Sequence, residues 1–350
     1  NGLSLLVGAA VGIITIRYLS VHEYSLYAVF GALIAAAATT SDLGVGNSLI
    51  PVLARTSDER KRLVADASAV RIRTLLILTS CSMFALLLLG ILVRETAVSQ
   101  AVYLVPILPM VIYFQGSATL LRGALAGVGR SEEIANALPI AALFRLIFVC
   151  AFFEGFGVSE IWVPALAWLG SSAYLYIDLR RRCEEEVEQS KSEEKLLFHP
   201  EIVKIAIPQL PGHIYYIGTG LVPILSLVGF AGNTSTAEFW ALGRLALLVS
   251  FIMPAMQYLA HPYVSRGGAE SFTTRSSIVL GGIIAFSAII VFSGVLAPKL
   301  WASILGDSYE NTYKYVPLAL SAACISIVSR TLYTLIIACG ETTFISASVP

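Results

Sequence analysis

Three arginines lie inside long apolar stretches of this sequence, where a charged side chain is costly. Arg145 stands near the middle of the stretch 135–153, while Arg244 and Arg330 lie closer to one end of theirs. Charged residues at such positions usually face a cavity or a partner, so each is a functional candidate. A guanidinium can grip a phosphate with two parallel hydrogen bonds. The three residues therefore predict an anion-binding site; the alternative is a structural pair with a buried carboxylate or carbonyl.

Three further residues are candidates for binding or for ion coupling. Arg17 lies near the end of its apolar stretch, where a long side chain can reach the membrane surface, so it is kept as a reserve candidate for substrate binding. Asp42 precedes two glycines that loosen a helix, and it could take up a proton or a sodium ion, or else pair with an arginine. His213 stands among prolines and glycines, and it could couple protons or simply pack.

The elements that would position these side chains are ten apolar stretches. Crossing a bilayer takes roughly 20 mostly apolar residues, and hydrocarbon requires such a stretch to be helical. With 57% hydrophobic and only 13% charged residues, the chain is predicted to be an all-α polytopic membrane protein. The stretches cover residues 1–19, 26–50, 72–93, 101–121, 135–153, 158–179, 202–230, 237–262, 276–298 and 315–339.

The basic residues of the loops predict the orientation. Of the 23 Lys and Arg residues, sixteen lie in or at the edges of every second gap between stretches, and four lie in or at the edges of the alternate gaps. Cytoplasmic loops are the richer in Lys and Arg, so the N-terminus is predicted to be inside, in the inner membrane. The sixteen are Arg55, Arg60, Lys61, Arg62, Arg71, Arg73, Arg122, Arg130, Arg180, Arg181, Arg182, Lys191, Lys195, Lys204, Arg266 and Arg275; the four are Arg17, Arg94, Lys299 and Lys314.

Three landmarks recur along the chain in the same order. Pro51 and Arg55 follow the second stretch as Pro262 and Arg266 follow the eighth, at an offset of 211 residues. The pairs Tyr27-Ala28 with Trp240-Ala241, and Gly129 with Gly340, recur at nearly the same offset. We therefore expect two copies of one unit. An even number of helices in each copy would make them parallel repeats, as in many transporters.

The duplication divides the chain into lobes. We expect an N-terminal six-helix lobe at 1–180, a cytoplasmic linker at 181–200 and a truncated C-terminal lobe at 201–350. The linker carries basic residues followed by acidic ones, which is typical of a solvated segment; a partner-binding role is the alternative. Because the chain starts at Asn1 and ends at the opening of an eleventh stretch, it is expected to be a fragment with ten to eleven of twelve or more helices.

Enzymatic and metal-dependent functions find little support in the sequence. It has no G-x-x-x-x-G-K-[ST] loop for binding nucleotide phosphates, and residues 127–129 are better explained as a helix end. Its five cysteines and four histidines show no spacing that suits a disulfide framework or a metal site. We therefore expect a protein that is not an enzyme and has no cofactor.

Several segments resemble those of a known family. Residues 17–28 (RYLSVHEYSLYA) are similar to R-x-L-G-x-x-E-Y-G-x-Y-A, and residues 41–50 are similar to a D-L-G-x-G segment. Residues 120–130 resemble a stretch that ends in Q-G-x-G-[RK], and residues 304–309 resemble an L-x-G-x-x-Y loop. These patterns belong to the polysaccharide-unit (O-antigen type) flippases of the MATE-like multidrug/oligosaccharidyl-lipid/polysaccharide superfamily. The chain departs from them at Ser20, where the family usually has Gly.

The resemblance implies two helix bundles around a V-shaped cavity, and a flippase that works by alternating access. The substrate would be a polyprenyl-diphosphate-linked oligosaccharide for lipopolysaccharide or another polysaccharide. Its diphosphate would lie near Arg145, Arg244, Arg330 and Arg17, and H⁺ or Na⁺ coupling would use Asp42 or His213. Its partners would be membrane lipid and other polysaccharide-assembly membrane proteins, and no nucleic acid. The alternatives are a multidrug or cation exporter of the same fold, and a membrane-embedded polymerase or glycosyltransferase.

Overall fold

The computed structural model describes most of the predicted helices in part or in full. The described residues are 2–42, 49, 53, 64, 67, 77, 79, 80, 82–84, 104–187, 218, 222, 223, 226–252 and 269–338. Within these ranges the chain forms helices and turns, and no strand occurs. The predicted all-α class is confirmed.

Four helical segments in the described part of the chain are long and apolar enough to cross a membrane. They are Val21–Ala38, Ser131–Gly155, Thr273–Leu296 and Asp307–Leu332. The last three have most of their side chains on the outside of the structure. Such exposure suits lipid, because apolar side chains gain nothing by facing water. The chain is therefore a multi-pass membrane protein.

The helices divide between two compact units. Residues 22–236 make one unit, and residues 1–21 together with 237–350 make the other. The predicted lobes group the first helix with residues 22–180, whereas the structure groups it with residues 237–350. The lobe boundaries stay a prediction. Residues 188–200 of the predicted linker lie outside the described residues, as do Pro51, Arg55, Pro262, Arg266 and Gly340 of the predicted repeat.

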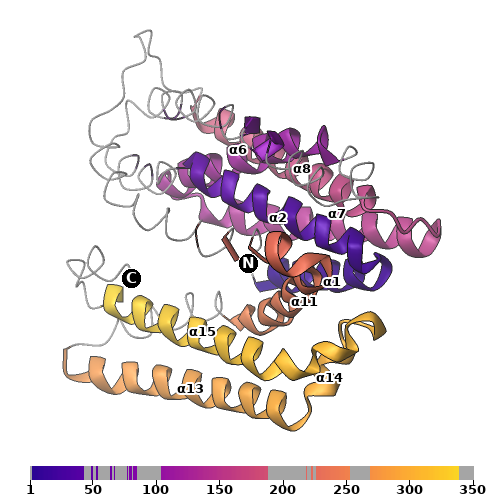
Figure 1. The fold of residues 1–350 in the computed structure, drawn as a ribbon. Helices are drawn as coiled ribbons and strands as arrows, with labels where there is room; N and C mark the ends of the chain where they lie inside the picture. The colour runs from indigo at the N-terminus through magenta and orange to yellow at the C-terminus, as the bar shows by residue number, and fades with distance from the viewer. Residues whose placement is uncertain are drawn as a thin grey trace. The chain divides into compact units, whose positions relative to one another are not determined.

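The unit formed by residues 22–236 is a bundle around α8. It contains α2 (Val21–Asp42), α6 (Ile107–Gly127), α7 (Ser131–Cys150) with its π-helical extension η1 (Ala151–Gly155), α8 (Trp162–Val187) and η3 (Leu227–Ala231). In Figure 1, α6, α7 and α8 lie side by side. The helix α8 continues to Val187, so residues 181–187 of the predicted linker are helical.

Close contacts and a tight turn hold α6, α7 and α8 together. A Cβ atom on Gly170 of α8 would lie only 2.7 Å from the ring of Phe144 of α7, so the absence of a side chain lets the two helices approach. The turn from α6 to α7 uses Gly129 at φ 85°, where the Arg130 N–H bonds the Leu125 carbonyl at 2.9 Å. This is a Schellman helix end, as expected for residues 127–129.

The other unit holds the first helix and the C-terminal ones. It contains α1 (Gly2–Tyr18), most of α11 (Gly232–Ser250), α13 (Ala269–Leu296), the short α14 (Pro298–Ser303), the 3₁₀ helix η4 (Asp307–Tyr315) and α15 (Val316–Ala338). Figure 1 shows α13 and α15 alongside each other, and a Cβ atom on Gly294 would lie 2.6 Å from Leu320.

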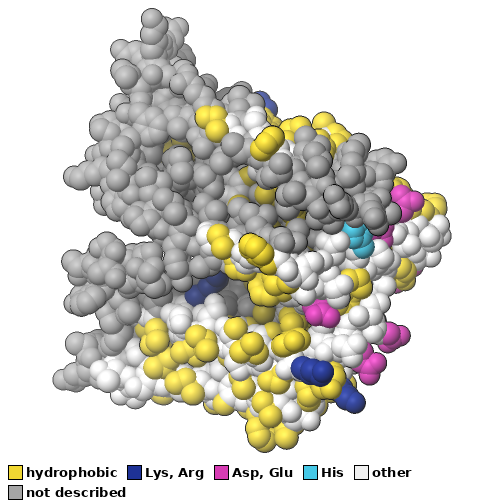
Figure 2. All heavy atoms as spheres, viewed as in Figure 1, with side chains coloured by type: hydrophobic (Ala, Val, Ile, Leu, Met, Phe, Trp, Pro, Cys, Tyr) yellow, Lys and Arg dark blue, Asp and Glu magenta, His cyan; other side chains and the backbone are white. Residues whose placement is uncertain are grey.

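The outer face of α13 and α15 is apolar. Ile289 and Phe292 of α13 and Leu318 and Ile325 of α15 are each more than 60% exposed. Figure 2 shows hydrophobic side chains spread over these helices, with charged side chains gathered near α14. A helix pair with an apolar face and a charged end is suited to lie in a bilayer with that end at the interface.

Candidate functional site

Arg145 is held by two aromatic side chains from neighbouring helices. Its Nη2 donates a hydrogen bond to the hydroxyl of Tyr27 on α2. Its guanidinium lies over the ring of Trp168 on α8, 4.3 Å from the ring centroid. A cation over an aromatic face is stabilised by about 0.5–2 kcal/mol, more when it is desolvated. The half-buried Arg145 is therefore fixed in direction by α2 and α8.

The two aromatic partners are themselves held by packing. Tyr27 and Phe30 of α2 are almost fully buried, and each ring lies near 6 Å from that of Trp168, at 6.1 and 6.2 Å between centroids. The Trp168 Nε1–H donates to the Oε1 of Gln115 on α6 at 2.9 Å. We call these five residues the Arg145 cluster: Tyr27, Phe30, Gln115, Arg145 and Trp168. The cluster joins α2, α6, α7 and α8.

The chemistry of the cluster suits an anion. Tyr27 and Trp168 are neutral, so they orient the guanidinium of Arg145 without cancelling its charge. A guanidinium carries five N–H donors in a planar fork that matches the oxygens of a phosphate. Surroundings of low polarity screen a positive charge weakly, so its attraction for a nearby anion is stronger there than in water.

Arg244 packs against the first helix in the other unit. A Cβ atom on Gly12 of α1 would lie 2.8 Å from the Cδ of Arg244, so the arginine stem crosses α1 where there is no side chain. The Arg244 guanidinium lies 5.3 Å from the Trp240 ring centroid. The side chain is half-buried. Arg244 thus follows the same pattern as Arg145, a cation directed by an aromatic ring.

The contact between Gly12 and Arg244 predicts a difference between two glycines of α1. Gly8 has nothing within 4 Å of its added Cβ, so Gly8→Ala should stabilise the helix by about 0.5–1 kcal/mol. Gly12→Ala should not stabilise the helix, because the new methyl group would displace the side chain of Arg244. The displacement of Arg244 should also reduce transport. Thermal unfolding in detergent and a transport assay would measure both effects. Equal behaviour of the two variants would show that the contact has no role.

Arg17 binds the end of a short helix that is far away in the sequence. Its Nε donates to the Ile304 carbonyl at 3.1 Å, and its Nη2 donates to the Ser303 carbonyl at 3.2 Å. These carbonyls close α14, and a cation at a helix C-terminus is favourable. The bond to Ile304 joins two segments of the family resemblance, 17–28 and 304–309.

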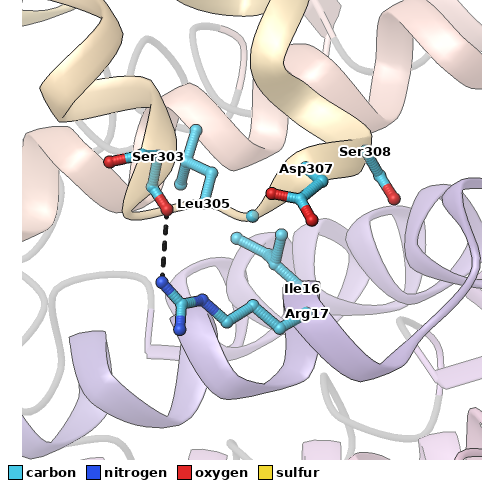
Figure 3. A pocket seen from close by; sticks show the side chains of 7 residues that line it. Ile16, Arg17, Ser303, Leu305, Asp307 and Ser308 are labelled. Atoms are coloured by element: carbon cyan, nitrogen blue, oxygen red, sulfur yellow. Dashed lines mark hydrogen bonds between the residues drawn. The ribbon is translucent and has the colours of Figure 1, made fainter.

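A polar hollow of about 300 Å³ lies beside this contact, within the same unit. Figure 3 shows Arg17 reaching toward Ser303, with Asp307 and Ser308 at the start of η4. Gly306 has φ +100°, and its added Cβ would lie 3.2 Å from the Cγ of Arg17. The lining residues are Ile16, Arg17, Ser303, Leu305, Gly306, Asp307 and Ser308.

The remaining candidates are placed only in part. Arg330 lies on α15 with an exposed side chain. Asp42 is the last residue of α2, and its side chain lies outside the described residues, as does all of His213. Arg145 belongs to the unit 22–236, whereas Arg17, Arg244 and Arg330 belong to the other one. Within the described residues, no group of three or more His, Cys, Asp or Glu side chains could hold a metal ion.

Sequence reasoning missed the residues that direct these arginines. Tyr27 was visible as part of the segment 17–28, and Trp168 as a polar-tipped aromatic residue within an apolar stretch. Neither signal shows which arginine each ring meets. Gln115 and Gly12 carried no signal that singled them out.

The chain matches one family model and several solved structures. The family model described as "Polysaccharide biosynthesis protein" matches residues 1–200. No curated protein sequence matches the chain. An inward-facing multidrug resistance MATE family transporter of the MOP superfamily is 14% identical with a TM-score of 0.72, over 99% of this chain and 83% of that one.

Two further structures show the same fold. An outward-facing multidrug resistance MATE family transporter is 15% identical with a TM-score of 0.61, over 99% of this chain and 82% of that one. A MOP superfamily transporter from Pyrococcus furiosus Vc1 (DSM3638), described as having a binding pocket of reverse polarity, is 16% identical with a TM-score of 0.53, over 97% of this chain and 88% of that one. The MATE-like fold expected from the resemblance is confirmed.

Proposed function

Because the chain belongs to the polysaccharide biosynthesis protein family, we propose that it is a flippase for a polyprenyl-diphosphate-linked oligosaccharide. The sugars and the diphosphate would cross in a cavity by alternating access, while the polyprenyl tail stays in the bilayer. The observation that carries the proposal is the Arg145 cluster, in which Tyr27 and Trp168 direct the Arg145 guanidinium within a helix long and apolar enough to cross a membrane.

The substrate's diphosphate explains why arginines are suitable here. A diphosphate presents several oxygens in a fixed arrangement, and a guanidinium can bind two of them with parallel hydrogen bonds. Arg145 would supply the main contact. Arg244, directed by Trp240, would supply a second, and Arg330 and Arg17 complete the proposed set of substrate-binding residues.

A multidrug or cation exporter is the second candidate, because two similar structures are described as multidrug resistance transporters. A cationic drug needs carboxylates or aromatic faces at its binding site. In the Arg145 cluster the aromatic face of Trp168 is already covered by a cation, which would repel a second one. The cluster therefore favours an anionic substrate.

The remaining parts of the proposal concern coupling and placement. Transport would be coupled to H⁺ or Na⁺ through Asp42 or His213. The chain would lie in the cytoplasmic membrane with its N-terminus inside, as the loop charges predict. Other polysaccharide-assembly membrane proteins would supply the substrate and remove it.

Reconstituted vesicles would test the substrate directly. The full-length protein is placed in liposomes that contain a fluorescent polyprenyl-diphosphate oligosaccharide, and its sugar is probed with a membrane-impermeant lectin. We expect the protein to equalise the lipid between leaflets, and to leave a polyprenyl monophosphate without sugar unmoved. Movement of a cationic dye but not of the lipid-linked sugar would favour the exporter instead.

A further inference from the structure

The polar hollow beside Arg17 lies where apolar helices of a single unit end. The helix α1 ends at Tyr18, the span Thr273–Leu296 ends at α14, and the next span begins at Asp307. The lining residues come from the end of α1 and from within residues 303–308, and all of them belong to the unit of residues 1–21 and 237–350. Membrane-spanning helices end where hydrocarbon meets water, so the hollow is expected to lie at the membrane surface.

Side chains typical of the membrane interface surround this segment. Trp301 of α14 donates its Nε1–H to the hydroxyl of Ser293 at 3.2 Å. The ammonium groups of Lys299 and Lys314 lie 5.6 and 6.0 Å from the ring centroid of Tyr313. Tryptophan, tyrosine and long basic side chains gather at the level of lipid headgroups. The segment from α14 to η4 is therefore expected to lie among headgroups.

Two opposite charges line the hollow without neutralising each other. Arg17 and Asp307 form no ion pair with each other or with any other described residue. Both side chains are exposed. In Figure 3 the Arg17 guanidinium and the Asp307 carboxylate lie on either side of Ile16. The hollow therefore presents a positive and a negative group with an apolar side chain between them.

Arg17 keeps hydrogen-bond donors for an anion. Its Nε and Nη2 bond the carbonyls of Ile304 and Ser303, which fix the direction of the guanidinium. Its Nη1 makes no hydrogen bond within the described part of the chain. A fixed guanidinium with N–H groups left over can bind the oxygens of a phosphate. Arg17 is therefore suited to hold a phosphate at the edge of the hollow.

Asp307 determines what else the ligand must carry. A carboxylate repels a bare anion, and it accepts hydrogen bonds from an ammonium group. The hydroxyl of Ser308, which also lines the hollow, can accept another. A ligand that satisfies both ends carries a phosphate and, a few bonds away, an ammonium with N–H donors. Phosphoethanolamine is a lipid headgroup with this structure, whereas phosphocholine lacks the N–H donors and phosphoglycerol lacks the cation.

We propose that the hollow is a binding site for the phosphoethanolamine headgroup of a membrane lipid. The phosphate binds Arg17, the ammonium binds Asp307 and Ser308, and the acyl chains stay in the bilayer. Single exposed charge contacts are weak, but a lipid confined to the membrane meets the site at a high local concentration. The proposal does not depend on the proposed flippase function. Arg17 would contact the diphosphate of the substrate only after the headgroup has left, because one guanidinium fork holds one phosphate.

Native mass spectrometry of the full-length protein in detergent can compare lipids directly. Phosphatidylethanolamine, phosphatidylcholine and phosphatidylglycerol with identical acyl chains compete for the protein. We expect phosphatidylethanolamine to bind about two- to fivefold more tightly than either of the others, which is the range for one exposed charge pair. Asp307→Asn should remove this preference, and Asp307→Lys should favour phosphatidylglycerol instead.

Glu310→Gln is the matched control for Asp307→Asn. Glu310 is an exposed carboxylate of the same 3₁₀ helix and does not line the hollow, so both variants change the net charge equally. Glu310→Gln should leave the lipid preference unchanged. Equal binding of the three lipids by the parent protein, or a preference that survives in Asp307→Asn, would overturn the proposal.

Free oligosaccharide, released from the fluorescent lipid-linked substrate, tests whether the hollow binds sugar instead. We expect it not to compete with phosphatidylethanolamine. If it displaces phosphatidylethanolamine from the parent protein, the hollow is a sugar site and the headgroup proposal is wrong. A protein that prefers phosphatidylethanolamine through Asp307 but moves no lipid-linked sugar would refute the flippase proposal and leave this one standing.

Discussion

Arg145→Ala is expected to reduce movement of the lipid-linked oligosaccharide by roughly thirtyfold or more. Truncating one partner of a desolvated charged contact costs about 2 kcal/mol or more, and each 1.4 kcal/mol is tenfold. Membrane insertion should be normal, because the change removes no charge from the loops that set the orientation. Arg145→Lys should recover only part of the activity, because an ammonium cannot bind the diphosphate through two parallel hydrogen bonds.

The partners of Arg145 allow its position and its charge to be tested separately. Tyr27→Phe removes the hydroxyl that accepts from Arg145 and keeps the ring, so it should weaken substrate binding without abolishing transport. Arg122→Ala is the matched control, since Arg122 bonds the Ala118 carbonyl and the Thr119 hydroxyl of its own helix. We expect it to have little effect on transport.

Protein level and polysaccharide output, measured in the same cells, distinguish a transport role of Arg145 from a structural one. A structural role predicts that Arg145→Ala is degraded or poorly folded, because Tyr27 and Trp168 lose the group that joins them. A transport role predicts a normal protein level and little surface polysaccharide. Full polysaccharide output from a normally expressed Arg145→Ala variant would remove this residue from the site.

Gly306→Ala is expected to destabilise the protein by about 2–4 kcal/mol. The residue has φ +100°, and its added Cβ would lie 3.2 Å from the Cγ of Arg17, so backbone strain and steric conflict act together. Arg17→Ala should lower the free energy of unfolding by about 1–2 kcal/mol, because it removes two hydrogen bonds to backbone carbonyls. The loss should be smaller than for a buried arginine, because Arg17 is exposed. Thermal unfolding in detergent would measure both variants.

Gly232 provides the matched control for this pair. It has φ 85° and ψ 179°, close to the φ 100° and ψ 169° of Gly306, and nothing lies within 4 Å of its added Cβ, so Gly232→Ala carries the backbone strain alone. The difference between Gly306→Ala and Gly232→Ala then reports the contact with Arg17. In an Arg17→Ala background that difference should shrink. If the two glycine variants behave alike, the proposed contact between α1 and the loop after α14 contributes nothing.

The membrane-spanning helices were readable from the sequence. The stretches 1–19, 135–153, 276–298 and 315–339 correspond closely to α1, α7 with η1, α13 and α15. The reason is the solvent: hydrocarbon leaves a chain of about 20 apolar residues no way to pair its backbone groups except a helix. The start of the stretch 26–50 was predicted too late, since α2 begins at Val21. The first turn of α2 contains the polar residues His22 and Glu23, so it did not belong to an apolar stretch.

The contacts between helices were decided only by the tertiary structure. Arg145 was a candidate because a cation is rare at membrane depth, but its hydrogen-bond partner Tyr27 lies 118 residues away in the sequence. In the same way, Arg17 bonds the carbonyl of Ile304, which lies 287 residues away. A helix that is apolar all round gives little indication of which face meets a neighbour. In lipid the choice depends on close packing at small residues, such as Gly12 against Arg244 and Gly170 against Phe144. A sequence shows that such a residue is small, but the side chain that fills the space beside it is known only when the helices are packed.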